Sequence, residues 1–101
     1  MVSATPVNAP RGETIVMVDG APQTLRLTLG ALAEIETGLA LGRLEELSER
    51  LARASAEDLL VVLGALVRGG GGRFADADLR AANIDLGEAA SAIGRAFAAG
   101  A

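Results

Sequence analysis

The spacing of apolar residues in this chain changes once, at Thr28, and this change constrains the possible folds most. Ahead of it, Ile15–Val18 suits a strand, Asp19-Gly20 is a turn signal, and Thr24–Thr28 alternates polar and apolar side chains. After it, apolar residues recur every three or four positions, as on one face of a helix. An isolated hairpin is not stable in water, so it must pack against the helices. The sequence therefore predicts an α+β fold, with an N-terminal β-hairpin packed on a small bundle of about five short helices.

The predicted hairpin extends from Thr14 to Thr28. Pro22 follows the turn closely, and we expect it to keep the loop from continuing as a strand. With a period of two, Leu25 and Leu27 face the core, and Arg26 between them faces water.

The helices are predicted from their apolar spacing and from residues that can cap a first turn, namely Thr28, Ser55, Asp76 and Asp85. They run from Leu29 to Gly38 or Gly42, from Arg43 to Ala54, from Ala56 to Arg68, from the Asp76 cap through Ala82, and from the Asp85 cap to about Ala99. In the second helix, Glu46–Arg50 and Glu49–Arg53 have the spacing of favourable ion pairs. The last helix is expected to bury the stripe Leu86, Ala90, Ile93 and Phe97.

The third predicted helix is apolar around nearly its whole circumference. We assign one of its stripes to the core: Leu59, Val62, Leu63 and Leu66. Leu60, Val61 and Val67 lie off that stripe, and we expect them to bind a partner helix or to support self-association. The alternative is that the whole helix is the central core helix of the domain.

Two other features resemble functional motifs but fit structural roles better. Gly69–Gly72 lacks the Lys-Ser or Lys-Thr of a phosphate-binding loop, so a flexible break is expected. The carboxylates between Asp76 and Glu88 do not match a Ca²⁺-binding loop, because Arg80 occupies a ligand position, so helix capping explains them better. No metal site or cofactor is predicted.

Composition excludes most enzyme chemistry. The chain has no His, Cys, Lys, Tyr or Trp, and all nine of its positive charges are Arg. It therefore lacks an imidazole base, a thiol or amine nucleophile and a phenol acid. It holds 21 Ala and 15 Leu, and we expect the alanines to add helix propensity more than core volume. The sequence predicts a helical protein that is not an enzyme.

Charge and hydropathy argue against two classes of partner, nucleic acids and membranes. The net charge of −4 and the dispersed Arg residues argue against binding nucleic acid. No apolar stretch is long enough to span a membrane, so no membrane association is expected. Residues 1–12, rich in Pro and polar side chains, are predicted to be a disordered tail, followed by a single domain over residues 13–101.

Several segments resemble a small family encoded in the tail-gene clusters of gene transfer agents, phage-like particles with which bacteria move DNA between cells. The resemblance rests on Arg11-Gly12-Glu13, on Asp19-Gly20 and above all on the run from Leu25 to Glu36. It continues more loosely through Leu44–Leu51 and Asp85–Glu88. The family is described as phage tail assembly chaperones and also carries the label tail tube protein.

The resemblance implies a non-catalytic tail assembly chaperone. Such a protein would hold the tape-measure protein in the cytoplasm while tube subunits polymerise, and would be absent from the finished particle. Its partners would be the tape-measure protein or other tail proteins, with a homo-oligomer as a further possibility. The alternative is a structural tail component, such as a tail tube or neck protein.

Overall fold

A computed structural model describes residues 13–100 of the chain. Two strands are followed by five helices: β1 (Glu13–Val18), β2 (Ala21–Arg26), α1 (Leu29–Gly38), α2 (Glu46–Ala52), α3 (Ala56–Gly69), α4 (Asp76–Ala81) and α5 (Leu86–Gly100). This order confirms the predicted α+β fold with an N-terminal hairpin. The predicted tail, residues 1–12, lies outside the described residues.

The hairpin is antiparallel and closes through a two-residue turn. Asp19 and Gly20 both have positive φ, 52° and 80°, as a type I′ turn requires. Val18 therefore pairs directly with Ala21, and Met17 pairs with Pro22 inside the ladder. The expectation that Pro22 stays outside the strand is wrong. Because hydrogen-bonded and non-bonded pairs alternate from the turn, Pro22 falls at a position that needs no N–H donor.

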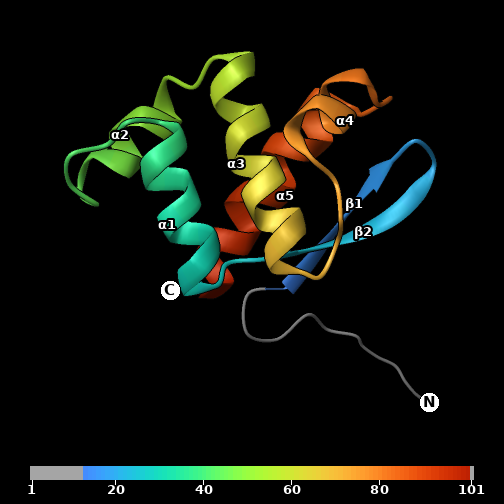
Figure 1. The fold of residues 1–101 in the computed structure, drawn as a ribbon, viewed down its shortest axis with the longest axis horizontal. Coiled ribbons are helices and arrows are strands. Elements are labelled where there is room, and N and C mark those ends of the chain that lie inside the picture. The colour runs from blue at the N-terminus through green and yellow to red at the C-terminus, as the bar shows by residue number, and fades with distance from the viewer. Residues whose placement is uncertain (1–12, 101) are drawn as a thin grey trace.

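The helices lie on one face of the hairpin (Figure 1). α3 packs against β2 and α5 packs against β1, while α1 lies against the side of α3. α2 is at the end of the molecule opposite the hairpin turn. The hairpin presents Val16, Val18 and Leu25 to the helices as fully buried side chains. The predicted register is confirmed at Leu25, whereas Leu27 and Arg26 are both half-buried.

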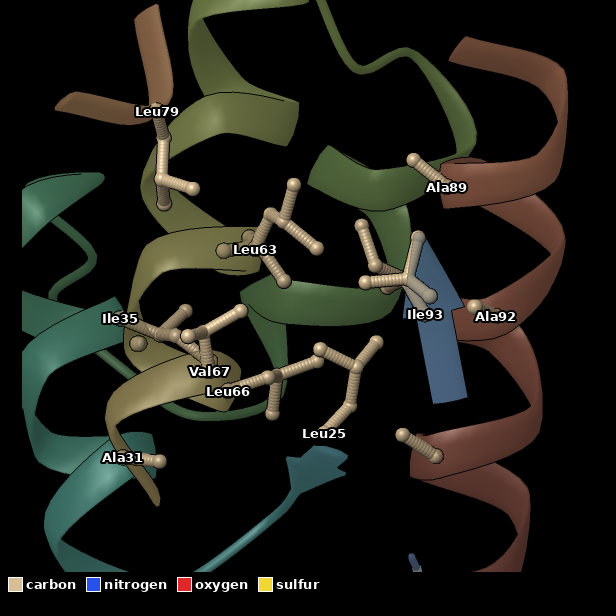
Figure 2. Packing of buried hydrophobic residues seen from close by; sticks show 14 of the residues in the cluster. Leu25, Ala31, Ile35, Leu63, Leu66, Val67, Leu79, Ala89, Ala92 and Ile93 are labelled. Atoms are coloured by element: carbon tan, nitrogen blue, oxygen red, sulfur yellow. The ribbon is translucent and has the colours of Figure 1, made fainter. Parts of the chain in front are cut away.

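The core is centred on α3 (Figure 2). Its side chains Leu63, Leu66 and Val67 point toward Ile35 of α1, Leu25 of β2 and Ile93 of α5. Of the predicted core stripe of α3, Val62, Leu63 and Leu66 are buried, but Leu59 is only half-buried.

The buried face of α5 differs from the predicted stripe. Ala89, Ala92 and Ala96 are buried beside Ile93, whereas Leu86 and Ala90 are exposed. Alanines therefore supply most of the buried face of this helix. Their small side chains allow α5 to lie close to β1 and α3, and a helix face of small residues suits such close packing.

The glycine run forms a packed turn in place of the expected flexible break. Gly69 ends α3, Gly70 caps it, and Gly71 has a φ of +100°. A Cβ on Gly70 would overlap the carbonyl oxygen of Thr24, and one on Gly72 would overlap Val67. The chain can pass this close to β2 and to the end of α3 only because these residues have no side chain.

The caps at Thr28 and Ser55 are confirmed. The Ala31 N–H donates to Thr28 Oγ1 at 2.9 Å, and the Asp58 N–H donates to Ser55 Oγ at 3.1 Å. Asp85 also caps α5, because its Oδ1 accepts from the Glu88 N–H at 2.9 Å. Asp76 does not cap α4, which is preceded by Ala75.

The ion pair predicted between Glu46 and Arg50 is replaced by a longer-range one. Arg50 donates to both carboxylate oxygens of Asp58, from Nε at 3.1 Å and from Nη2 at 3.2 Å. Its Nη1 donates to the Leu39 carbonyl at 3.0 Å. Arg50 thus joins the end of α1 and the start of α3 to α2, because the buried carboxylate of Asp58 and a helix-end carbonyl are better partners than a solvated Glu.

Candidate partner-binding surface

The three residues predicted to bind a partner are separated by the structure. Val67 is 0% exposed, so the expectation that it lies outside the core is wrong. The reason is its position near the end of α3, where β2 packs on one side and the loop through Gly72 folds back over it. Leu60 and Val61 are both half-buried, and their role in binding stays a prediction.

Val61 points toward α1. A Cβ on Gly38 would overlap Val61 Cγ1, so the two helices touch closely there. The depression beside this contact is open and is lined mainly by small or polar residues of α1, such as Gly30, Ala33 and Thr37. Val61 is the large aliphatic side chain of its lining, so it holds fewer such side chains for a partner than a groove between leucines would.

Leu60 lines an apolar groove between α3, α4 and α5. This α3–α5 groove has a volume of about 220 Å³. Its lining residues are mostly aliphatic: Ala56, Glu57, Leu59, Leu60, Leu63, Leu79, Arg80, Ala82, Ile84, Leu86 and Ala89. Small-molecule sites typically occupy about 300–1,000 Å³, so the groove suits one or two inserted side chains better than a whole cofactor.

Leu86 is the exposed large aliphatic residue of this groove. It is the first residue of α5 and is 60% exposed, although it is large and aliphatic. No helical turn precedes it to cover its side chain, and the neighbouring Gly87 has no side chain that could shield it from solvent. The sequence placed Leu86 in the buried stripe. Its position directly after the Asp85 cap is the signal that could have revealed its exposure.

The walls of the groove are fixed by helix caps at the starts of α3 and α5 and by a contact between the α4–α5 linker and the hairpin turn. Ser55 caps the start of α3 and Asp85 caps the start of α5, so both helices begin at the groove. The linker between α4 and α5 is tied to the hairpin turn, because the Asn83 N–H donates to Asp19 Oδ1 at 2.7 Å. The groove is therefore bounded by anchored segments.

A paired charge bridges two of the walls. Arg80 of α4 donates to both oxygens of Glu57 on α3, from Nη1 to Oε1 at 2.7 Å and from Nη2 to Oε2 at 2.8 Å. These hydrogen bonds lower the pKa of Glu57 below its ordinary value. The opposite charges of Glu57 and Arg80 cancel at the rim of the groove. The Glu57 carboxylate stays ionised and accepts hydrogen bonds.

The acids proposed from sequence as helix caps have structural partners. Asp76 accepts from Arg68 Nη1 at 3.2 Å, and Asp78 accepts from the Ala75 N–H at 3.0 Å. Among residues 13–100, no group of three or more acidic side chains is placed to hold a metal ion. In the same part of the chain, no helix is both long and apolar enough to cross a membrane.

Chemically, the groove offers aliphatic surface and one neutralised ion pair. Such a site can hold apolar side chains from a helical partner.

Comparisons with known proteins identify the family. No curated protein matches the chain, and no solved structure matches it. A family model described as "Phage tail tube protein, GTA-gp10" matches residues 11–99, which is nearly the whole chain. The chain therefore belongs to the GTA-gp10 family of phage and gene transfer agent tail proteins.

Proposed function

We propose that this chain is a non-catalytic tail assembly chaperone that holds an apolar helical segment of the tape-measure protein in the α3–α5 groove. The observation that carries the proposal is the groove with Leu86 exposed at its rim and Leu60 in its wall. Each large aliphatic side chain that a partner covers contributes about 1.5–3 kcal/mol of burial. A helix that inserts side chains there gains affinity without disturbing the core.

The absence of His, Cys, Lys and Tyr supports a binding role. A chaperone of this kind needs an apolar surface and a solubilising exterior, and the net charge of −4 helps to keep the protein soluble. It would act in the cytoplasm, where tails assemble, and leave before the particle is complete.

A structural tail component is the second candidate. The description of the matching family, a tail tube protein, favours it. In that case the groove would bind a neighbouring subunit of the tail, and the protein would persist in the particle.

Binding is tested by co-expressing the full chain with the tape-measure protein of the same gene cluster. We expect the two to co-purify, and we expect Leu86→Gln and Leu60→Gln each to reduce the recovered partner about tenfold. Leu29→Gln is the matched control, because Leu29 is exposed on α1, outside the groove. Equal recovery with all three variants would rule out the groove as the binding site.

Mass spectrometry of purified particles separates the two candidates. A chaperone is absent from mature particles but present in lysates of assembling cells. Detection at a copy number similar to that of the tube subunits would exclude the chaperone and support the structural role.

A further inference from the structure

Within the described residues 13–100, the outer edge of β1 has no neighbouring strand, and we propose that it pairs with β1 of a second copy of this chain. Hydrogen-bonded and non-bonded pairs alternate along the hairpin, starting from the bonded pair Val18–Ala21 beside the turn. The N–H and C=O groups of Ile15 and Met17 therefore point away from β2. Within residues 13–100, these groups have no hydrogen-bond partner.

The opposite edge of the hairpin is protected. On β2, Pro22 has no N–H to offer. The end of α3 covers the rest, because a Cβ on Gly69 would overlap the Arg26 carbonyl and one on Gly70 would overlap the Thr24 carbonyl. Natural sheets protect their edges with proline, charge or a covering segment. The segment Thr14–Val18 has neither proline nor charge, so of the two edges this one is left open by the part of the chain that the structure describes.

The side chains along the open edge suit a copy of themselves. Ile15 is 49% exposed and Met17 is 40% exposed, on the face of β1 that points away from the helices. In a symmetric antiparallel pair centred on Val16, Ile15 faces Met17 of the second copy and exchanges both backbone hydrogen bonds with it. The twofold axis repeats this apolar pair, and the two hairpins form one continuous sheet.

Charge complementarity favours this register. Arg95 of α5 donates from Nε to Thr14 Oγ1 at 3.4 Å, and it forms no ion pair within residues 13–100. In the symmetric pair, Thr14 faces Val18 of the second copy, next to Asp19. Asp19 accepts from the Asn83 N–H with Oδ1, and its other oxygen forms no hydrogen bond or ion pair within residues 13–100. Each end of the interface thus brings a guanidinium near a carboxylate, which an unrelated strand would not supply.

This interface is separate from the α3–α5 groove, because none of the groove-lining residues belongs to β1. The inference therefore does not depend on the proposed chaperone role.

The oligomeric state of the full chain tests the inference. We expect sedimentation equilibrium to show a dimer that dissociates on dilution. Ile15→Lys, which places two cations across the axis, should weaken the dimer at least about tenfold. Leu44→Lys is the control, because Leu44 is 45% exposed and lies far along the chain from the hairpin. A monomer at every concentration, or equal weakening by both variants, would overturn the inference.

Hydrogen exchange locates the interface directly. The amides of Ile15 and Met17 should become at least about tenfold more protected as the protein is concentrated from the monomeric to the dimeric range. A dimer in which these two amides exchange as fast as in the monomer uses another face and contradicts the inference.

A charge reversal at the surface tests the same interface if the Ile15→Lys variant does not fold. Arg95→Glu should weaken the dimer about tenfold by setting a carboxylate beside Asp19 of the second copy. Arg73→Glu, an exposed Arg in the loop before α4, is its control and should dimerise like the parent. Equal affinity in the two charge variants would remove the argument for this register.

Discussion

At the scale of single residues, the turn after α3 depends on the absence of side chains. Gly69 and Gly70 lie against carbonyl oxygens of β2, and Gly72 lies against Val67. The neighbouring Arg68 fastens the same turn, because its Nη1 donates to the Phe74 carbonyl at 2.8 Å and its Nη2 to Glu34 Oε1 at 2.8 Å. The glycines allow α3 to cover the edge of β2, and Arg68 keeps the following loop in place.

Gly70→Ala should therefore destabilise the protein. The added methyl group meets backbone, which cannot swing away, so we expect a loss of about 1–3 kcal/mol in the free energy of unfolding. Gly94→Ala is the matched control, because nothing lies within 4 Å of a Cβ at that position on α5. Alanine there should stabilise the helix by about 0.5–1 kcal/mol. Urea unfolding measures both, and a neutral Gly70→Ala would mean that the turn is loosely packed.

The ion pair between Arg50 and Asp58 makes the stability of the fold depend on pH. Hydrogen bonds from the Arg50 guanidinium, followed by the one from the Ser55 N–H, lower the pKa of Asp58 below its ordinary value. A carboxyl whose pKa is lower in the folded state stabilises the fold above its unfolded-state pKa. That stabilisation is lost as the pH falls through the folded-state pKa.

Asp58→Asn should consequently be less stable than the parent at neutral pH, and the difference should shrink as the pH falls below the ordinary range of a carboxyl group. Urea unfolding measured from pH 7 to pH 3 follows both proteins. Glu49→Gln, which removes an exposed carboxylate of α2, is the control. A difference between Asp58→Asn and the parent that stays constant with pH would contradict the expected linkage.

At the scale of elements, α5 is the helix whose packing depends most on small residues. Ala89, Ala92 and Ala96 form its buried face, and Ile93 is the large aliphatic side chain among them. This face lies against β1 and α3, so the separation between α5 and the hairpin is set by methyl groups. A larger residue on it must push the helix away from the strand.

Ala92→Leu should cost about 1–3 kcal/mol through overpacking. Ala90→Leu, two residues earlier on the exposed face of the same helix, should change stability by less than about 0.5 kcal/mol. Thermal unfolding separates them, since about 1 kcal/mol shifts the Tm of a domain of this size by about 4–8 °C. The reverse ranking would support the sequence-based stripe through Ala90 instead of the observed face.

At the scale of the whole molecule, the two proposed surfaces lie on different elements. The α3–α5 groove is formed by helices, whereas the open edge belongs to β1. They are linked by the contact between Asp19 in the hairpin turn and Asn83 in the linker before α5, and by the packing of α5 against β1. Both surfaces leave the buried core unchanged, so one chain can present them together.

We therefore expect the two surfaces to act independently. Leu86→Gln should keep the dimer affinity of the parent, and Ile15→Lys should keep the recovery of the tape-measure protein. The double variant should lose both dimer affinity and recovery of the tape-measure protein, each by the amount seen in the single variant. The free-energy effects of substitutions at distant sites without shared partners are additive. Sedimentation and co-purification of the three variants measure this. A dimer weakened by Leu86→Gln would show that the Asp19–Asn83 contact couples the surfaces.

The sequence by itself determined the kind and order of the elements. Helix starts at Thr28 and Ser55, the Asp19-Gly20 turn and the change of apolar period are local signals, since each depends on residues within a few positions. For the same reason the burial of Leu25 could be predicted, because strand geometry alone points it inward.

Only the tertiary structure decided which apolar side chains are covered. Val67 was expected at a binding surface and is buried, because β2, from a distant part of the chain, and the glycine turn that follows α3 close over it. Leu86 was expected in the core and is exposed, because within residues 13–100 no element packs over the first residue of α5. Periodicity divides a helix into faces, but coverage of each face depends on segments that the fold brings together from elsewhere in the chain.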